Sequence, residues 1–188
     1  PGSKFNITNP KYPKLNLSFE KGLGATNTDY NFDHLSLKLT QNMSLENKGR
    51  LSYNLQGGTF FGDSNNAFMD YKHLNGNQTH INLDSDYLSS FKNLGYYDLS
   101  SSENYFEYHL EHDFSGYILG KIPLINKLNY NLIVGVHGFS TKNKKPYQEF
   151  SLGVNNIGWG KYRFLRVDYV RSYQSGFVND GVLFGISL

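Results

Sequence analysis

The chain has 188 residues, a formal net charge of +2 and no cysteine. This length fits one domain or part of one. The lack of cysteine excludes disulfide bonds, thiolate zinc sites and cysteine nucleophiles, and the small net charge without a basic cluster argues against nucleic-acid binding. Tyrosine (15) and phenylalanine (14) are abundant, which is typical of a β protein with aromatic residues at an interface.

The regular elements are predicted from stretches in which apolar and polar residues alternate, the pattern of a strand with two different faces. No apolar run reaches the length of a transmembrane helix, about 18 residues. We predict about eight strands, all antiparallel neighbours. In chain order they are Lys14–Gly22, His34–Ser44, Arg50–Phe60, Tyr105–Phe114, Leu128–His137, Gln148–Asn155, Arg163–Ser172 and Gly181–Leu188.

The connections between these strands differ in length. Leu45–Gly49 and Asn156–Tyr162 are predicted as short turns, whereas Phe61–Glu103 is the longest irregular stretch. A connection this long in a compact domain is usually functional or packs on something. It holds too many aromatic residues for a solvated coil. We therefore predict an ordered extracellular loop that covers the mouth of a barrel as a lid, with a short helix at Asp84–Lys92.

Alternation does not by itself say which face meets water. A soluble carrier barrel turns its apolar face inward, and a membrane barrel turns it outward. Aromatic residues near strand ends, connections that are long on one side and short on the other, and a final apolar strand favour the membrane. The predicted fold is an all-β, antiparallel transmembrane β-barrel of about eight strands with a long extracellular loop, and we favour closure within one chain over a larger barrel formed by two copies.

The polar face of the predicted strands gathers charged residues. Glu107, His109 and Glu111 share one face, and Arg166 and Asp168 lie on a nearby strand. A catalytic or metal site is one interpretation, since such groups could converge. A network of paired charges that fills the barrel lumen is the favoured one, because buried charges need partners. We assign the lumen network, with no catalytic, cofactor or metal site, to Glu107, His109, Glu111, Arg166, Asp168, Arg50 and Glu149.

Several motifs resemble a known family. They are NYFEYHLEHDFSGYILGKIPLINKLNYN (Asn104–Asn131), HLNGNQTHINLD (His73–Asp84), FSLGVNNIGWGKYRFLRVDYV (Phe150–Val170) and Phe60-Phe61-Gly62. They resemble outer-membrane proteins of unassigned function that carry a carboxypeptidase-regulatory-like domain ahead of a C-terminal β-barrel. That barrel is similar to the surface-antigen (BamA/TamA-like) superfamily. The chain departs from the family at Asp63-Ser64-Asn65, where Pro and Tyr are usual, and the family offers no catalytic residues to carry over.

The resemblance implies a piece of a larger protein. Residues 1–3, Pro-Gly-Ser, look like the scar of a cleaved tag, and 4–188 are expected to be the outer-membrane barrel fragment. The expected function is that of an integral barrel of the Gram-negative bacterial outer membrane, with a structural, transport or assembly role and no enzyme activity or cofactor. Its expected partners are outer-membrane lipid and other envelope proteins, with no nucleic acid.

Two alternatives stay open at this point. One is a membrane-embedded hydrolase or acyltransferase, with His109 as base and Ser151 or Ser52 as nucleophile. The other is a soluble carrier of apolar ligands, which requires residues such as Leu51 and Leu132 to face an apolar interior.

Overall fold

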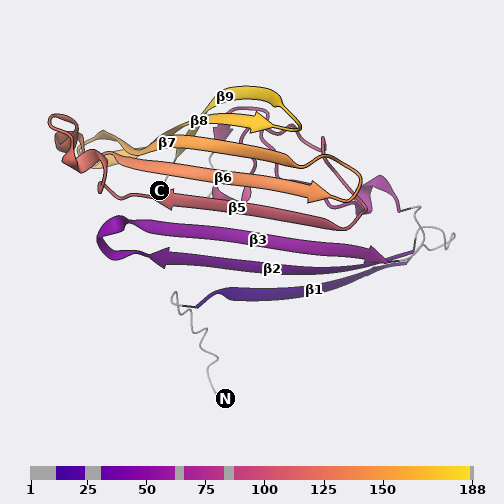
Figure 1. Ribbon diagram of the computed structural model, residues 1–188. Helices are drawn as coiled ribbons and strands as arrows, with labels where there is room; N and C mark the ends of the chain where they lie inside the picture. Colours follow the sequence, from indigo (N-terminus) through magenta and orange to yellow (C-terminus); the bar gives the residue numbers. More distant parts are fainter. Residues whose placement is uncertain (1–11, 24–30, 62–65, 83–86, 187–188) are drawn as a thin grey trace, which may run out of the picture.

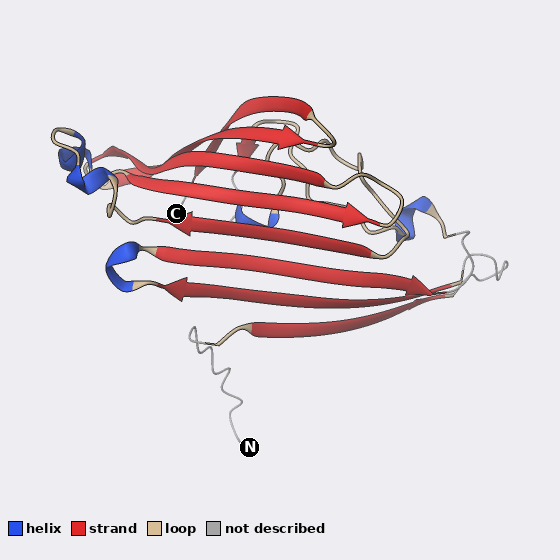
Figure 2. Ribbon diagram, in the orientation of Figure 1, coloured by secondary structure: helices blue, strands red, loops and turns tan. Residues whose placement is uncertain are grey.

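The computed structural model describes residues 12–23, 31–61, 66–82 and 87–186. They form a curved, nine-stranded sheet, and part of the β3–β5 connection lies behind it (Figure 1). The predicted all-β class is confirmed: in these residues the helical turns are short 3-10 helices, drawn in blue in Figure 2. None of the described helices is long and apolar enough to cross a membrane. Residues 1–3 lie outside the described part.

The sheet runs in the order β1-β2-β3-β5-β6-β7-β8-β9-β4, and every neighbouring pair is antiparallel except β9 and β4. Hairpin connections place sequential strands side by side. The long strands are β1 (Lys14–Gly22), β2 (Phe32–Ser44), β3 (Arg50–Phe61), β5 (Tyr105–Asp113), β6 (Asn131–Thr141), β7 (Tyr147–Trp159), β8 (Tyr162–Tyr173) and β9 (Phe177–Ile186).

Some strand limits differ from the prediction. The strand β7 continues through the expected turn to Trp159, because bulges near Val154 and Ile157 absorb the irregular register. The strand β6 begins only at Asn131, since the 3-10 helix η6 (Ile125–Leu128) takes up its expected start. Of the helix predicted at Asp84–Lys92, the described part holds only the 3-10 turn η4 (Tyr87–Ser89).

The expected self-closed barrel is wrong for the described residues. Along its whole length β1 pairs only with β2, and β9 pairs with β8 and with the two-residue strand β4 (Ile81–Asn82). The β4 strand comes from the long connection and lies parallel to β9 at Phe184–Gly185, where the Phe184 N–H also bonds to the His80 carbonyl. This pairing occupies the part of the β9 edge at Phe184–Gly185, and β1 does not pair with β9. The sheet is therefore open.

The long connection folds back onto the concave face of the sheet. We call its described residues, 66–82 and 87–104, the inner segment. A small apolar core joins this segment to β5, β6 and β7, and it consists of Leu74, Phe91, Leu94, Tyr105, Phe139 and Tyr147. Phe91 is fully buried against the rings of His109 and Tyr147. The lid prediction is thus wrong in position, because the segment fills the concave side, although Tyr96 and Tyr97 stay exposed.

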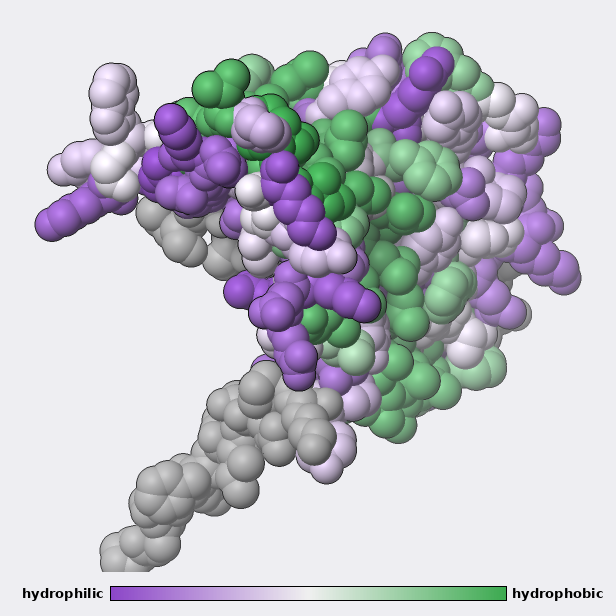
Figure 3. Space-filling model, turned by 60° about the vertical axis from the view of Figure 1, so that its left-hand side comes forward, coloured by the Kyte–Doolittle hydropathy of each residue, from purple (hydrophilic) through white to green (hydrophobic). Residues whose placement is uncertain are grey.

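The two faces of the sheet have opposite character. The convex face exposes large apolar side chains, for example Leu17 (71% exposed), Leu152 (54%) and Phe184 (56%). Figure 3 shows hydrophobic surface as a band that crosses the view from top to bottom, with hydrophilic surface on both sides of it. The concave face buries charged residues under the inner segment. This distribution is the reverse of that in an ordinary soluble protein.

The turn between β2 and β3 depends on Gly49. Its φ of +99° is strained for other residues, and an added Cβ would collide with the Asp113 carbonyl oxygen. We expect Gly49→Ala to lower the free energy of unfolding by about 1–3 kcal/mol or more, measured by chemical denaturation. The control is Gly120→Ala, where no atom lies within 4 Å and a change within about 0.5 kcal/mol is expected. Equal effects of the two substitutions would contradict this account of the turn.

Candidate functional site

The candidate site is a buried polar network on the concave face. Alternation along β5 turns Glu107, His109 and Glu111 to this face, and along β8 it does the same for Arg166 and Asp168. All five residues are at most 8% exposed, and His109 and Asp168 are fully buried. Charges this deep are stable only when other charges and hydrogen bonds compensate them.

Arg166 links the two strands through its guanidinium group. It donates to both carboxylate oxygens of Asp168, at 2.7 and 2.9 Å, and to both of Glu111, at 2.9 and 3.1 Å. Arg166 therefore pairs with both Glu111 and Asp168. Bidentate ion pairs of this kind fix the orientation of the two groups as well as the distance between them. The guanidinium thus sets the relative position of the two carboxylates.

Tyr87 of the inner segment covers this ion pair. Its hydroxyl donates to Asp168, and its ring lies 3.9 Å from the Arg166 guanidinium carbon. Burial, and after it the Asp168 carboxylate, raises the pKa of the Tyr87 phenol well above its ordinary value. The phenol therefore stays protonated and acts as a donor. A loop residue thus completes the surroundings of two strand residues.

Lys92 of the inner segment enters the centre of the network. Its ammonium group donates to Glu111 Oε1 at 2.7 Å and to His137 Nε2 at 2.8 Å, and its side chain is fully buried. The backbone N–H groups of Lys92 and Asn93 donate to the two oxygens of Glu149, at 2.7 and 2.9 Å. The Glu149 carboxylate on β7 therefore binds the backbone of the inner segment, and the Glu111 carboxylate on β5 binds the Lys92 side chain.

A directional chain of hydrogen bonds leads from Lys92 through two histidines. An ammonium group can only donate, so His137 accepts at Nε2 and carries its proton on Nδ1. That proton points to His109 Nδ1, 2.9 Å away, and His109 in turn donates from Nε2 to Glu107 Oε1 at 3.0 Å. These tautomers follow from the bonding pattern. Both rings are satisfied in their neutral form.

The sequence-predicted site residues fall into two groups. Glu107, His109, Glu111, Glu149, Arg166 and Asp168 all lie on the concave face, within one connected set of contacts. Arg50 does not join them: it is exposed at the start of β3, opposite Asp113. Arg50 does point to the same side of β3 as the other polar residues of that strand. It lies at the end of the strand, however, beyond the reach of the inner segment.

Lys92, Tyr87 and His137 were missed as members of the network. His137 carried a signal, since it shares the polar face of its strand with Gly135. The sequence provided no such indication for Lys92 and Tyr87, because they lie in a connection between strands, where alternation does not assign a residue to a face of the sheet. Among the described residues, no group of three or more His, Asp or Glu is arranged to hold a metal ion.

The geometry needed for a serine nucleophile is not formed around His109. Both of its ring nitrogens are engaged, one by His137 and one by Glu107. Ser151 is buried, and its hydroxyl has no hydrogen-bond partner in the described structure. A nucleophile needs a base within hydrogen-bond reach.

We expect Lys92→Met to release the inner segment. The substitution leaves Glu111 and His137 without their central donor, and removing one partner of a buried pair costs about 3–5 kcal/mol. The midpoint of chemical denaturation should fall by a matching amount, and limited proteolysis should cut within residues 66–101. The control Lys142→Met removes an exposed lysine and should change stability by less than about 0.5 kcal/mol. Equal midpoints would mean that Lys92 is no anchor.

We expect Arg166→Leu to destabilise the domain far more than Arg171→Leu. The first removes the cation of Asp168 and leaves Glu111 with Lys92 alone, and breaking a buried ion pair costs about 3–5 kcal/mol. Arg171 is exposed and lies over the rings of Tyr173 and Phe177, a contact worth about 0.5–1 kcal/mol. Denaturation midpoints of both variants provide the measurement, and similar midpoints would contradict the role given to Arg166.

Comparison with known proteins gives one match. Residues 1–154 match the model of a family of unknown function, DUF5686, in its C-terminal domain. The match spans β1 to β6 and most of β7, so it includes the β5 residues of the network and ends before Arg166. No curated protein and no solved structure matches the chain. The chain therefore belongs to the DUF5686 family, as its C-terminal domain.

Proposed function

We propose that this domain forms part of the wall of an outer-membrane β-barrel, with a structural or assembly role and no chemistry of its own. The observation that carries the proposal is the reversed distribution of polarity: apolar side chains are exposed on the convex face, and charged ones are buried on the concave face. A monomeric soluble protein rarely exposes so continuous an apolar surface. In a membrane barrel the same distribution is the rule.

The ends of the strands support the same orientation. Trp159 (90% exposed) and Tyr162 (76%) flank the β7–β8 turn, while Phe61, Phe106 and Phe177 are exposed at the opposite ends of β3, β5 and β9. Aromatic residues at both ends of an apolar band match the two interfaces of a bilayer. The hydrophilic surface on either side of the band in Figure 3 would then meet the head groups.

The open edge implies further strands. In hydrocarbon, each unpaired backbone group of β1 would cost several kcal/mol, and none of the described residues pairs with the outer side of β1 (Lys14–Gly22). We propose that strands outside this sequence pair with β1 and complete a barrel larger than the eight-stranded one predicted. The family description, which calls the matched region a C-terminal domain, is consistent with more chain before it.

The inner segment favours a structural or assembly role over an open diffusion channel. It packs Phe91 and Lys92, both at most 1% exposed, against β5, β6 and β7. An interior filled in this way leaves no wide aqueous path along these strands. The soluble-carrier alternative has less support, because it needs the apolar face inside. The hydrolase alternative lacks a serine bonded to His109.

The test uses the absence of native cysteine, which makes any introduced cysteine a unique labelling site. A fluorophore on Leu152→Cys, on the convex face of β7, should be strongly quenched by lipids brominated in their acyl chains. A fluorophore on Lys142→Cys, in the exposed β6–β7 turn, should not be. Equal quenching at the two sites, together with protein that stays dissolved without detergent, would overturn the proposal.

A further inference from the structure

The inner segment contains a pocket that plays no part in the polar network. It has a volume of about 460 Å³ and is lined by His73, Leu74, Asn75, Gly76, Asn77, Ile81, Asn82, Ser90, Tyr96 and Tyr97. This volume lies within the range of small-molecule sites, about 300–1,000 Å³. Every lining residue belongs to the inner segment, so the pocket does not depend on how the sheet is completed.

The pocket is held open by hydrogen bonds between two stretches of the segment. The Asn77 N–H donates to the Leu94 carbonyl at 2.8 Å, and the Phe91 N–H donates to the Asn75 carbonyl at 2.7 Å. Gly76 permits this close approach, because an added Cβ would lie 2.5 Å from the Leu94 carbonyl oxygen. The walls are therefore fixed before any ligand arrives, which lowers the entropy cost of binding.

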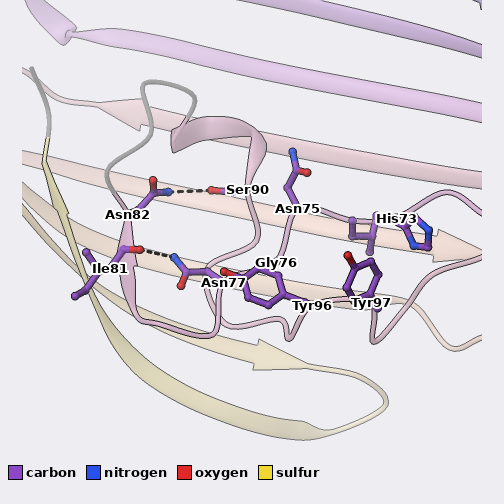
Figure 4. Close-up of a pocket in the computed structure, with 10 residues that line it drawn as sticks. His73, Asn75, Gly76, Asn77, Ile81, Asn82, Ser90, Tyr96 and Tyr97 are labelled. Atoms are coloured by element: carbon purple, nitrogen blue, oxygen red, sulfur yellow. Dashed lines mark hydrogen bonds between the residues drawn. The ribbon is translucent and has the colours of Figure 1, made fainter. Parts of the chain in front are cut away.

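Asn77 shapes the end of the pocket near β4. Its side-chain oxygen accepts from the backbone N–H groups of Thr79 and His80, both at 3.0 Å, and its amide donates to the Ile81 carbonyl at 3.1 Å. Figure 4 shows this bond and the one from Asn82 to Ser90. In that view Asn75, Asn82 and Ser90 lie in the upper part of the group of lining residues, and Asn77, Tyr96 and Tyr97 lie in the lower part.

The lining offers polar groups that the described structure does not use. The side-chain oxygen of Asn75 and the hydroxyls of Tyr96 and Tyr97 make no hydrogen bond to described residues, and all three side chains are exposed. The ring of Tyr97 stands edge-on to that of His73, with centroids 5.1 Å apart. Amide and phenol groups both donate and accept, while the tyrosine faces present flat apolar surface.

The residues that line the pocket in the described part of the chain favour an uncharged ligand. No Asp, Glu, Lys or Arg is among them, so these side chains offer no carboxylate, ammonium or guanidinium group to pair with a charged ligand. A neutral pyranose has hydroxyls that donate and accept around its edge and a C–H face that stacks on an aromatic ring. We propose that this pocket binds a neutral carbohydrate.

The test is saturation-transfer NMR on the purified domain with four neutral disaccharides, maltose, cellobiose, lactose and chitobiose, and with glucuronic acid as the charged comparison. At least one neutral sugar should bind with a Kd of about 1 mM or tighter, and glucuronic acid should not. Absence of saturation transfer to all four disaccharides would overturn the proposal. The result does not depend on the membrane location, since the pocket is built from the inner segment alone.

Matched variants locate the binding. Tyr97→Ala should weaken it by about tenfold, the equivalent of one lost aromatic contact, and Asn75→Ala, which keeps both rings, should weaken it severalfold. Tyr117→Ala, in the distant β5–β6 connection, should leave it unchanged. Because Asn75 is exposed and makes one long side-chain bond, 3.5 Å to the Ser89 carbonyl, its variant should fold normally. Equal affinity in all three variants would place the sugar elsewhere and overturn the assignment.

Discussion

The structure depends on one buried cation. Lys92 reaches the concave face from a connection with no regular structure of its own, and there it neutralises Glu111 while bonding to His137. Without it, Glu111 would keep only Arg166 as its cation and would share it with Asp168, while Glu107 pairs separately with Lys72. Burying such groups is expensive unless the pairing is complete. The inner segment and the charged face of the sheet therefore require each other.

This dependence explains why the domain can fold with so small an apolar core. The core cluster joins three residues of the inner segment to one residue each of β5, β6 and β7. The remaining order comes from the hydrogen bonds between strands and from polar contacts with fixed directions. Examples are the bonds from the Arg166 guanidinium to Glu111 and Asp168, and the bonds from the backbone of Lys92 and Asn93 to Glu149. Satisfied polar networks of this kind specify one arrangement more than they add stability.

The sequence predicted what depends on neighbours along the chain. Alternation gave the all-β class, most strands, and the face on which Glu107, Glu111 and Arg166 lie. It gave nothing on contacts between distant parts. The parallel pairing of Ile81 with Phe184, the insertion of Lys92 and the open β1 edge all depend on how a loop folds. Arg50 alternates correctly with its neighbours in β3. Alternation does not show, however, how far along the strand the inner segment extends.

The position of the inner segment between β3 and β5 has a mechanical consequence. These strands are hydrogen-bonded neighbours from Arg50↔Asp113 to Gly58↔Tyr105, so the segment leaves the sheet and returns to it at one place. Withdrawing it from the concave side requires breaking the short β4 pairing and side-chain contacts, while every long ladder stays intact. The segment is therefore attached to the described sheet mainly through side chains, and its withdrawal would expose the charges that Lys92 compensates.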